Sequence, residues 1–169
     1  MNVVYDEYVL RPEVMFIKAI ECNGREHTMI VEEKQTLEVT MNPLDLIKKS
    51  CIAYGVTYNG RRDASKLLLS TEKKVPVIID HIDGIYLFPL ASHIGRGNAW
   101  ISLSKVERIL PVSSKCTSVL FRNGQRFSFP VSERSLQKQY AKASKLQVVI
   151  KEQLYELNRK IQREMATSV

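Results

Sequence analysis

The chain has 169 residues, 44% of them hydrophobic and 25% charged, which suits one folded domain and excludes a chain that is disordered throughout. The formal net charge of +7 is unevenly spread, because residues 1–41 carry four Lys/Arg against eight Asp/Glu, whereas residues 109–169 carry eleven against four. An acidic front and a basic remainder favour a surface for an anionic partner. Nucleic acid is the first candidate, an anionic membrane surface is a weaker one, and a merely solvated basic surface is the alternative.

Several classes of protein are disfavoured by what the sequence lacks. The chain has three cysteines, Cys22, Cys51 and Cys116, and an odd number suits reduced thiols better than disulfides. Neither these cysteines nor the three histidines have the spacing of metal ligands. No GxGxxG, Walker, HExxH or GxSxG motif is present. No apolar run approaches the ~18 residues of a membrane span, and the first residues do not form a signal peptide. We therefore expect a cytoplasmic protein that is not an enzyme, binds no metal or cofactor, and does not enter a membrane.

The acidic residues 1–41 are predicted to form a β-hairpin. Strands are expected over Val14 to Cys22 and Arg25 to Glu32, joined by Asn23-Gly24, which is a strong two-residue turn signal. A short third strand is expected over Leu37 to Val39. The acidity argues against DNA contact here, so this part either packs on the core or faces a protein partner.

A helix is predicted from Pro43 to Tyr54. Asn42 is a suitable N-cap, proline suits the first helical position, and Gly55 suits a left-handed cap after the last turn. The apolar face is predicted to consist of Leu44, Ile47, Cys51 and Tyr54.

Basic residues follow in two glycine-containing stretches. Asn59-Gly60 predicts a tight turn that presents Arg61 and Arg62, followed by a short strand over Lys66 to Leu69. Arg96 stands between two glycines, and such an arginine can enter a narrow A·T minor groove. The alternative is a pair of solvated loops.

Further short strands are expected in hairpins up to residue 131. Pro76 confines its strand to a strand start or an edge, Trp100 is predicted to be a core residue, and Asn123-Gly124 predicts another hairpin turn. The expected ranges are 75–80, 85–88, 99–102, 105–110, 115–122 and 125–131. The fold class is therefore α+β: mainly antiparallel β-hairpins with one internal helix and a long C-terminal amphipathic helix.

That last helix is predicted over about 132–165, with Ser132 or Ser135 as its cap. Its apolar stripe is on the order of 40 Å long at ~1.5 Å per residue, which is longer than a small domain can cover. Self-association through a second copy is one explanation, and packing entirely on its own sheet is the other. The candidate oligomerisation residues are Leu146, Ile150, Leu154, Leu157 and Ile161. The opposite face is basic and either contacts phosphates or is solvated (Lys138, Lys142, Lys145, Lys151, Arg159, Lys160 and Arg163).

Six motifs occur in an order and spacing that resemble one known family. They are NPLDLIKKSCIAYGVTYNGRRDAS, VPVIID, IYLFPLAS, NAWIS, VLFRNG and FPVSERSLQKQY, and together they span about residues 41–143. This pattern resembles the competence transcription factor family of Firmicutes, ComK. The resemblance implies an activator of DNA-uptake genes that binds paired AT-rich boxes, largely through the minor groove, as a dimer or higher oligomer.

The resemblance also implies protein partners. An activator implies contact with RNA polymerase, and family members are delivered to a protease by an adaptor that recognises segments including the C-terminal tail. The last residues here, KIQREMATSV, do not resemble the expected tail, which leaves adaptor-mediated turnover open.

The residue assignments come from physical inference. We predict groove or near-groove contacts from Asn59, Arg61, Arg62, Lys66 and Arg96. Phosphate contacts are predicted from Lys48, Lys49, Lys73 and Lys74. Two other functions stay open: a regulatory protein-interaction module without sequence-selective DNA binding, and, more weakly, RNA binding, for which the strands lack the usual aromatic spacing.

Overall fold

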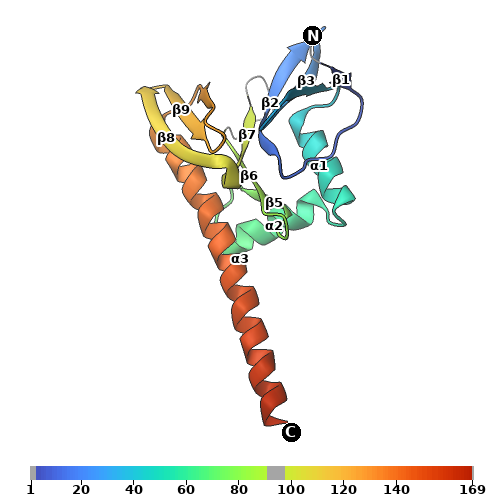
Figure 1. Ribbon diagram of the computed structural model, residues 1–169, viewed down its shortest axis with the longest axis vertical. Helices are drawn as coiled ribbons and strands as arrows, with labels where there is room; N and C mark the ends of the chain where they lie inside the picture. Colours follow the sequence, from blue (N-terminus) through green and yellow to red (C-terminus); the bar gives the residue numbers. More distant parts are fainter. Residues whose placement is uncertain (1–2, 91–97, 169) are drawn as a thin grey trace.

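A computed structural model describes residues 3–90 and 98–168, and it confirms the α+β class (Figure 1). One sheet has seven strands in the order β1-β4-β3-β2-β7-β6-β5, and a second has three in the order β10-β9-β8. All pairings are antiparallel except that of β1 with β4. The elements are β1 Val4–Tyr5, β2 Val14–Cys22, β3 Arg25–Glu32, β4 Thr36–Val39, α1 Pro43–Ala53, α2 Tyr58–Leu69, β5 Val77–Asp80, β6 Ile85–Pro89, β7 Ala99–Ser102, the 3-10 turn Leu103–Lys105, β8 Val106–Ser113, β9 Cys116–Phe121, β10 Arg126–Phe129 and α3 Glu133–Thr167.

The predicted N-terminal hairpin is confirmed, and it is part of the large sheet. Asn23 and Gly24 have φ values of 51° and 74°, as a tight hairpin turn of this kind requires. Strand β2 also pairs with β7, which joins the acidic segment to the later strands. Ion pairs of 2.6 Å from Lys49 to Glu7 and from Lys105 to Glu33 link it to the basic remainder. Of the two options that the sequence left open, packing on the core is the one observed.

Helix α1 lies against one face of the seven-stranded sheet (Figure 1). Asn42 caps it by accepting a hydrogen bond from the Asp45 amide at 2.9 Å, as predicted, and Gly55 follows with a φ of 79°. Leu46 and Ile47 are fully buried there with Cys51, whereas Leu44, expected on this face, is only partly buried.

The sequence prediction was wrong for residues 58–69, which form a second internal helix, α2. The Thr57 hydroxyl accepts a hydrogen bond from the Gly60 amide at 3.1 Å and so begins a helix where a turn and a strand were expected. Asn59 and Gly60 occupy the first helical turn, where their amides have no helical carbonyl partner in any case. Their turn propensity was therefore misleading.

The other face of the large sheet packs against the three-stranded sheet and α3. The ring of Phe16 lies 5.6, 4.9 and 5.1 Å from the rings of Phe121, Phe127 and Phe129, which joins the two sheets. Trp100 is 6% exposed and belongs to the core on the α1 side, as predicted.

Helix α3 begins at the Ser132 cap and continues well beyond the body of the protein (Figure 1). Its first half buries Leu136, Gln139, Ala143 and Leu146. Every residue of 151–168 is exposed. Leu146 is fully buried in its own core, so its assignment to a contact with a second copy is corrected here. Within residues 3–90 and 98–168, no helix has the length and apolarity that crossing a membrane requires.

Candidate nucleic-acid interface

The loop between α2 and β5 is fastened to the first half of α3. The Gln139 side chain, 2% exposed, donates hydrogen bonds of 2.8 Å to the carbonyl oxygens of Lys74 and Pro89. The Lys142 ammonium donates a further bond of 2.8 Å to the Lys73 carbonyl. Lys74 has a φ of 49°, a left-handed conformation that is unfavourable for a lysine. These bonds to its carbonyl and its neighbour's hold the loop in place despite that strain.

This anchoring brings the charges of Lys74, Lys138 and Lys142 near one another, and Lys73 precedes Lys74 in the loop; we call these four residues the lysine cluster. Burial, followed by the charges of Lys138 and Lys74, lowers the pKa of Lys142, so the positive groups are close enough to repel one another. Among the described residues, none of the four lysines forms an ion pair with a carboxylate. The cluster is thus a concentration of unneutralised positive charge.

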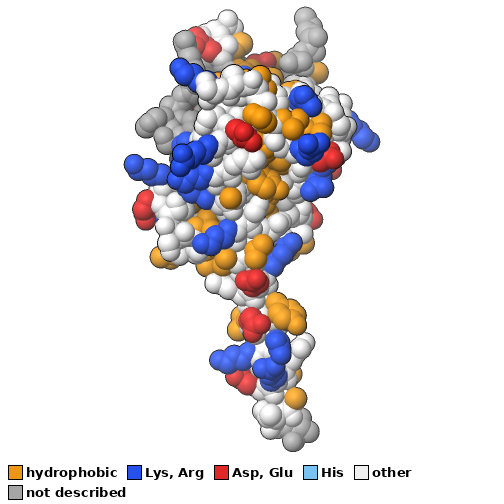
Figure 2. Space-filling view, turned by 90° about the vertical axis from the view of Figure 1, so that its left-hand side faces the viewer, with side chains coloured by type: hydrophobic (Ala, Val, Ile, Leu, Met, Phe, Trp, Pro, Cys, Tyr) orange, Lys and Arg blue, Asp and Glu red, His pale blue; other side chains and the backbone are white. Residues whose placement is uncertain are grey.

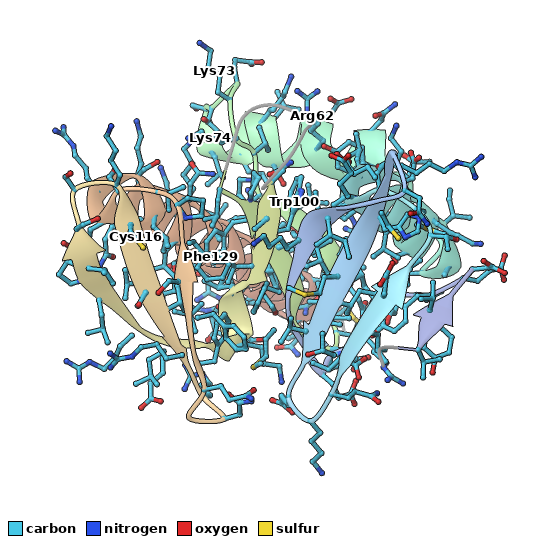
Figure 3. All side chains as sticks on the ribbon, turned by 90° about the horizontal axis from the view of Figure 1, so that it is seen from above. Arg62, Lys73, Lys74, Trp100, Cys116 and Phe129 are labelled. Atoms are coloured by element: carbon cyan, nitrogen blue, oxygen red, sulfur yellow. The ribbon has the colours of Figure 1, made fainter. Side chains whose placement is uncertain are left out.

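Arg62 lies on the same edge of the molecule as Lys73 and Lys74 when the molecule is viewed from above (Figure 3). The side chain of Arg61 points in another direction from that of Arg62, because successive residues of a helix are rotated by about 100°. Its Nε atom is buried and has no hydrogen-bond partner among the described side chains and backbone. Burial raises the pKa of Cys51 and of Tyr86, and the charge of Arg61 opposes both shifts, which places Arg61 near these core residues. The two arginines therefore do not project side by side.

The remaining residues predicted to contact DNA differ in their exposure and in whether a carboxylate neutralises them. Asn59 and Lys48 are exposed. Lys66 is paired with Glu72 at 3.0 Å, and Lys49 with Glu7 at 2.6 Å, so part of their charge is neutralised. Arg96 lies outside the described residues.

Lys138 and Lys142 were not among the predicted DNA contacts. The sequence placed them on a basic face of the last helix, but nothing in their spacing linked that face to Lys73 and Lys74, which lie more than sixty residues earlier. The signal that could have found them was the basic periodicity of residues 138–145. What was missing was the docking of α3 against the α2–β5 loop.

Ammonium groups without carboxylate partners are suited to phosphate, which they neutralise with release of counterions. Figure 2 shows Lys and Arg side chains gathered on the flanks of the body, with hydrophobic side chains between them. The lysine cluster can therefore bind a phosphate backbone and position it on the protein. The cluster contains no nucleophile paired with a base.

The projecting half of α3 has a separate apolar feature. Leu154, Leu157 and Ile161, at steps of three and four, are 47%, 54% and 44% exposed. Hydrophobic patches alternate with charged side chains along this part of the molecule (Figure 2). We call these three residues the stem stripe. Ile150, predicted with them, is partly buried against the core.

Comparison with known proteins gives two matches in sequence and one in structure. The family model described as "ComK: ComK protein" matches residues 5–155. The competence transcription factor of Bacillus subtilis (strain 168) is 27% identical over 134 residues, which cover 79% of this chain and 70% of that protein.

The structural match is to the LytTr DNA-binding domain of a methyl-accepting/DNA response regulator from Bacillus cereus. It covers 75% of this chain and 76% of that one, with 11% identity and a TM-score of 0.35. A similarity this low supports no inference about fold or function. The family model, in contrast, spans most of the chain, from β1 into the projecting half of α3. The chain therefore belongs to the ComK protein family.

Proposed function

We propose that this protein is a DNA-binding transcriptional regulator of competence genes that acts in the cytoplasm and is not an enzyme. Membership of the ComK family and the similarity to a competence transcription factor support the regulatory role. The single structural observation that supports DNA binding is the lysine cluster, in which hydrogen bonds between α3 and the α2–β5 loop bring the charges of Lys74, Lys138 and Lys142 near one another beside Lys73.

The cluster supplies affinity rather than sequence selectivity, because lysine contacts to phosphate position a protein on DNA without reading bases. We assign the groove contacts to Arg62 and Asn59 in the N-terminal part of α2, with Arg96 as a further candidate; Arg62 lies on the same edge of the molecule as Lys73 and Lys74 (Figure 3). An arginine in the minor groove distinguishes A·T from G·C base pairs through groove width and potential. Paired AT-rich boxes are the target that this reading mode favours.

Lys48 and Lys66 would add phosphate contacts at the borders, and Lys49 would do so once it leaves Glu7. Arg61 is assigned a different role. Its buried Nε and its position near Cys51 and Tyr86 support a part in holding α2 against the sheet.

Binding to paired boxes calls for two copies of the protein, and we propose that the stem stripe joins them. Leu154, Leu157 and Ile161 repeat on one side of a helix whose own body does not cover them. A dimer that buried these side chains would remove apolar surface from water at about 25 cal/mol per Å². Contacts with RNA polymerase and with a proteolytic adaptor are further partners that this function would require or permit.

The test is a fluorescence-anisotropy titration of two duplexes, one with paired A-tract and T-tract boxes and one rich in G·C, each at two salt concentrations. We expect preference for the AT-rich duplex and a binding constant that falls steeply with salt. The charge-neutralising variant Lys73→Gln/Lys138→Gln, at two exposed lysines of the cluster, should weaken binding to both duplexes. It should also lower the salt slope by about 1 for each phosphate that is no longer neutralised.

The matched control is Lys34→Gln/Lys115→Gln, which removes the same charge from two exposed lysines outside the cluster. An equal loss of affinity in both double variants would mean that only net charge matters, and the cluster would lose its assigned role. Salt-independent binding without A·T preference would leave the protein-interaction module as the better function.

A further inference from the structure

Three polar side chains meet on one face of the large sheet near the tip of the β2–β3 hairpin. The register pairs Ile20 with His27, Cys22 with Arg25, and Met29 with Glu38. Because side chains alternate between the faces of a strand, Cys22, His27 and Glu38 all lie on the same face. The opposite face carries Thr28 and the residues that pack on α1.

The ligand atoms of these three residues are close together. The Cys22 sulfur, a ring nitrogen of His27 and a carboxylate oxygen of Glu38 all lie within 4.8 Å of one another. His27 Nδ1 is 2.7 Å from Glu38 Oε1, and the two side chains are only 13% and 15% exposed. Cys22 is a partly buried free thiol, so its sulfur is available as a ligand.

An open cavity of about 580 Å³ adjoins this group and gives it access to solvent. Its lining includes Cys22 and His27 together with Asp6, Thr40 and Arg25. The Asp6 carboxylate, at the edge of the same cavity, accepts a hydrogen bond of 3.2 Å from the Thr40 hydroxyl. The Arg25 charge opposes a cation here, which sets a limit on affinity.

We propose that Cys22, His27 and Glu38 form a binding site for a divalent transition metal of the Zn²⁺ class. Thiolate and imidazole ligands select such ions over Mg²⁺ and Ca²⁺, which prefer oxygen. Zinc bonds of about 2.0–2.3 Å place ligand atoms roughly 3 to 4 Å apart in a tetrahedron. The observed spacing reaches that geometry through small side-chain rotations on strands whose backbones are already fixed.

Water from the adjoining cavity fills the fourth position. For His27 and Glu38 both to ligate the ion, His27 Nδ1 gives up its hydrogen bond to Glu38 Oε1, and each atom bonds to the metal instead. Loss of the thiol proton on binding puts a negative sulfur beside the cation. The ion would link β2, β3 and β4, within a segment whose net charge is −4.

Sequence spacing does not show this site, because the three ligands come from three strands and are five and eleven residues apart. Only the cross-strand register aligns them. The proposal is independent of the DNA-binding function, since the site lies in the acidic hairpin and not in the lysine cluster.

The experiment uses the full chain, reduced, stripped of metal with a chelator and titrated with Co²⁺ as a spectroscopic probe for Zn²⁺. We expect one equivalent to bind with a thiolate-to-cobalt charge-transfer absorption, and Zn²⁺ to displace it. Cys22→Ser should abolish this absorption. Glu38→Gln and His27→Gln should weaken Co²⁺ binding by about ten- to a hundredfold or more.

The controls are Cys116→Ser, at a partly buried free thiol in the other sheet, and His81→Gln, in the β5–β6 turn. Both should bind Co²⁺ as the unaltered protein does. Thermal unfolding of each metal-free variant shows whether it folds. If Cys22→Ser does not fold, Glu38→Gln tests the site in its place. An absorption that is missing in the unaltered protein, persists in Cys22→Ser, or disappears in Cys116→Ser would overturn the proposal.

Discussion

The two halves of helix α3 share an apolar repeat but have opposite surroundings. In the first half, Leu136, Ala143 and Leu146 are fully buried against the two sheets. In the second half, Leu154, Leu157 and Ile161 continue the same steps of three and four while remaining about half exposed. An amphipathic pattern therefore indicates that a helix face needs a partner, but it does not say which partner.

The difference also separates the two functions that we propose for this helix. The packed half carries Lys138, Lys142 and the buried Gln139 that fastens the loop bearing Lys73 and Lys74. The projecting half carries the stem stripe, the exposed side chains of Tyr155 and Met165, and a solvated charged face. Substitutions in the two halves should consequently affect different measurements, namely stability and DNA affinity in the first and self-association in the second.

The largest expected effect is that of Leu146→Ala. Removing a fully buried leucine side chain leaves a cavity, so the free energy of unfolding should fall by about 2–5 kcal/mol in urea titration. Leu154→Ala, the matched change in the projecting half, should lower it by less than about 0.5 kcal/mol at a concentration where the protein is monomeric. Similar decreases in both variants would mean that the second half is packed in solution.

A second expected effect concerns the buried amide that joins the packed half to the basic loop. Gln139→Met keeps the side-chain length but leaves the carbonyls of Lys74 and Pro89 without this donor, and the loss of the buried bond to Pro89 should cost about 1–3 kcal/mol. The free energy of unfolding should fall by a similar amount in urea titration. DNA affinity should also fall, because the α2–β5 loop of the lysine cluster is no longer fastened to α3. DNA binding that is unchanged in folded Gln139→Met protein would separate the loop from the interface.

The third effect is specific to the projecting half. Leu154→Ser/Ile161→Ser should shift the dimer–monomer equilibrium toward monomer in sedimentation equilibrium, because serine cannot replace the apolar packing between the two helices. The free energy of unfolding of the monomer should stay within about 0.5 kcal/mol. The control is Lys151→Ser/Arg159→Ser on the same stretch of helix, which should leave the association unchanged. Dimers that persist in the stripe variant would place the interface elsewhere.

The smallest effect tests the strained lysine. At a φ of 49°, Lys74→Gly should stabilise the protein by up to about 1 kcal/mol while lowering DNA affinity. Ser70→Gly is the matched control, since Ser70 has a φ of 50° and no charge; it should stabilise similarly without changing DNA affinity. A decrease in affinity in both glycine variants would point to loop flexibility and not to the Lys74 charge.

Local chemistry was enough to predict much of the fold. The Asn23-Gly24 turn, the Asn42 cap and the long helix after Ser132 depend on residues only a few positions apart, so the sequence alone predicts them. Residues 58–69 were misassigned because Asn59-Gly60 favours a turn in isolation, whereas the Thr57 cap and packing against the sheet favour a helix. Strand β1 was missed because two residues carry too little pattern to predict a strand.

The candidate sites also combine features that the local sequence predicts with features that only tertiary packing sets. The sequence by itself determined which side chains are basic, which helix is amphipathic and where several of the hairpins turn, because these depend on residue type and short-range spacing. Only the tertiary structure decided that Arg61 is partly buried, that Lys138 and Lys142 join Lys73 and Lys74, and that Cys22, His27 and Glu38 meet. The physical reason is that helix docking and cross-strand register bring together residues that are far apart along the chain.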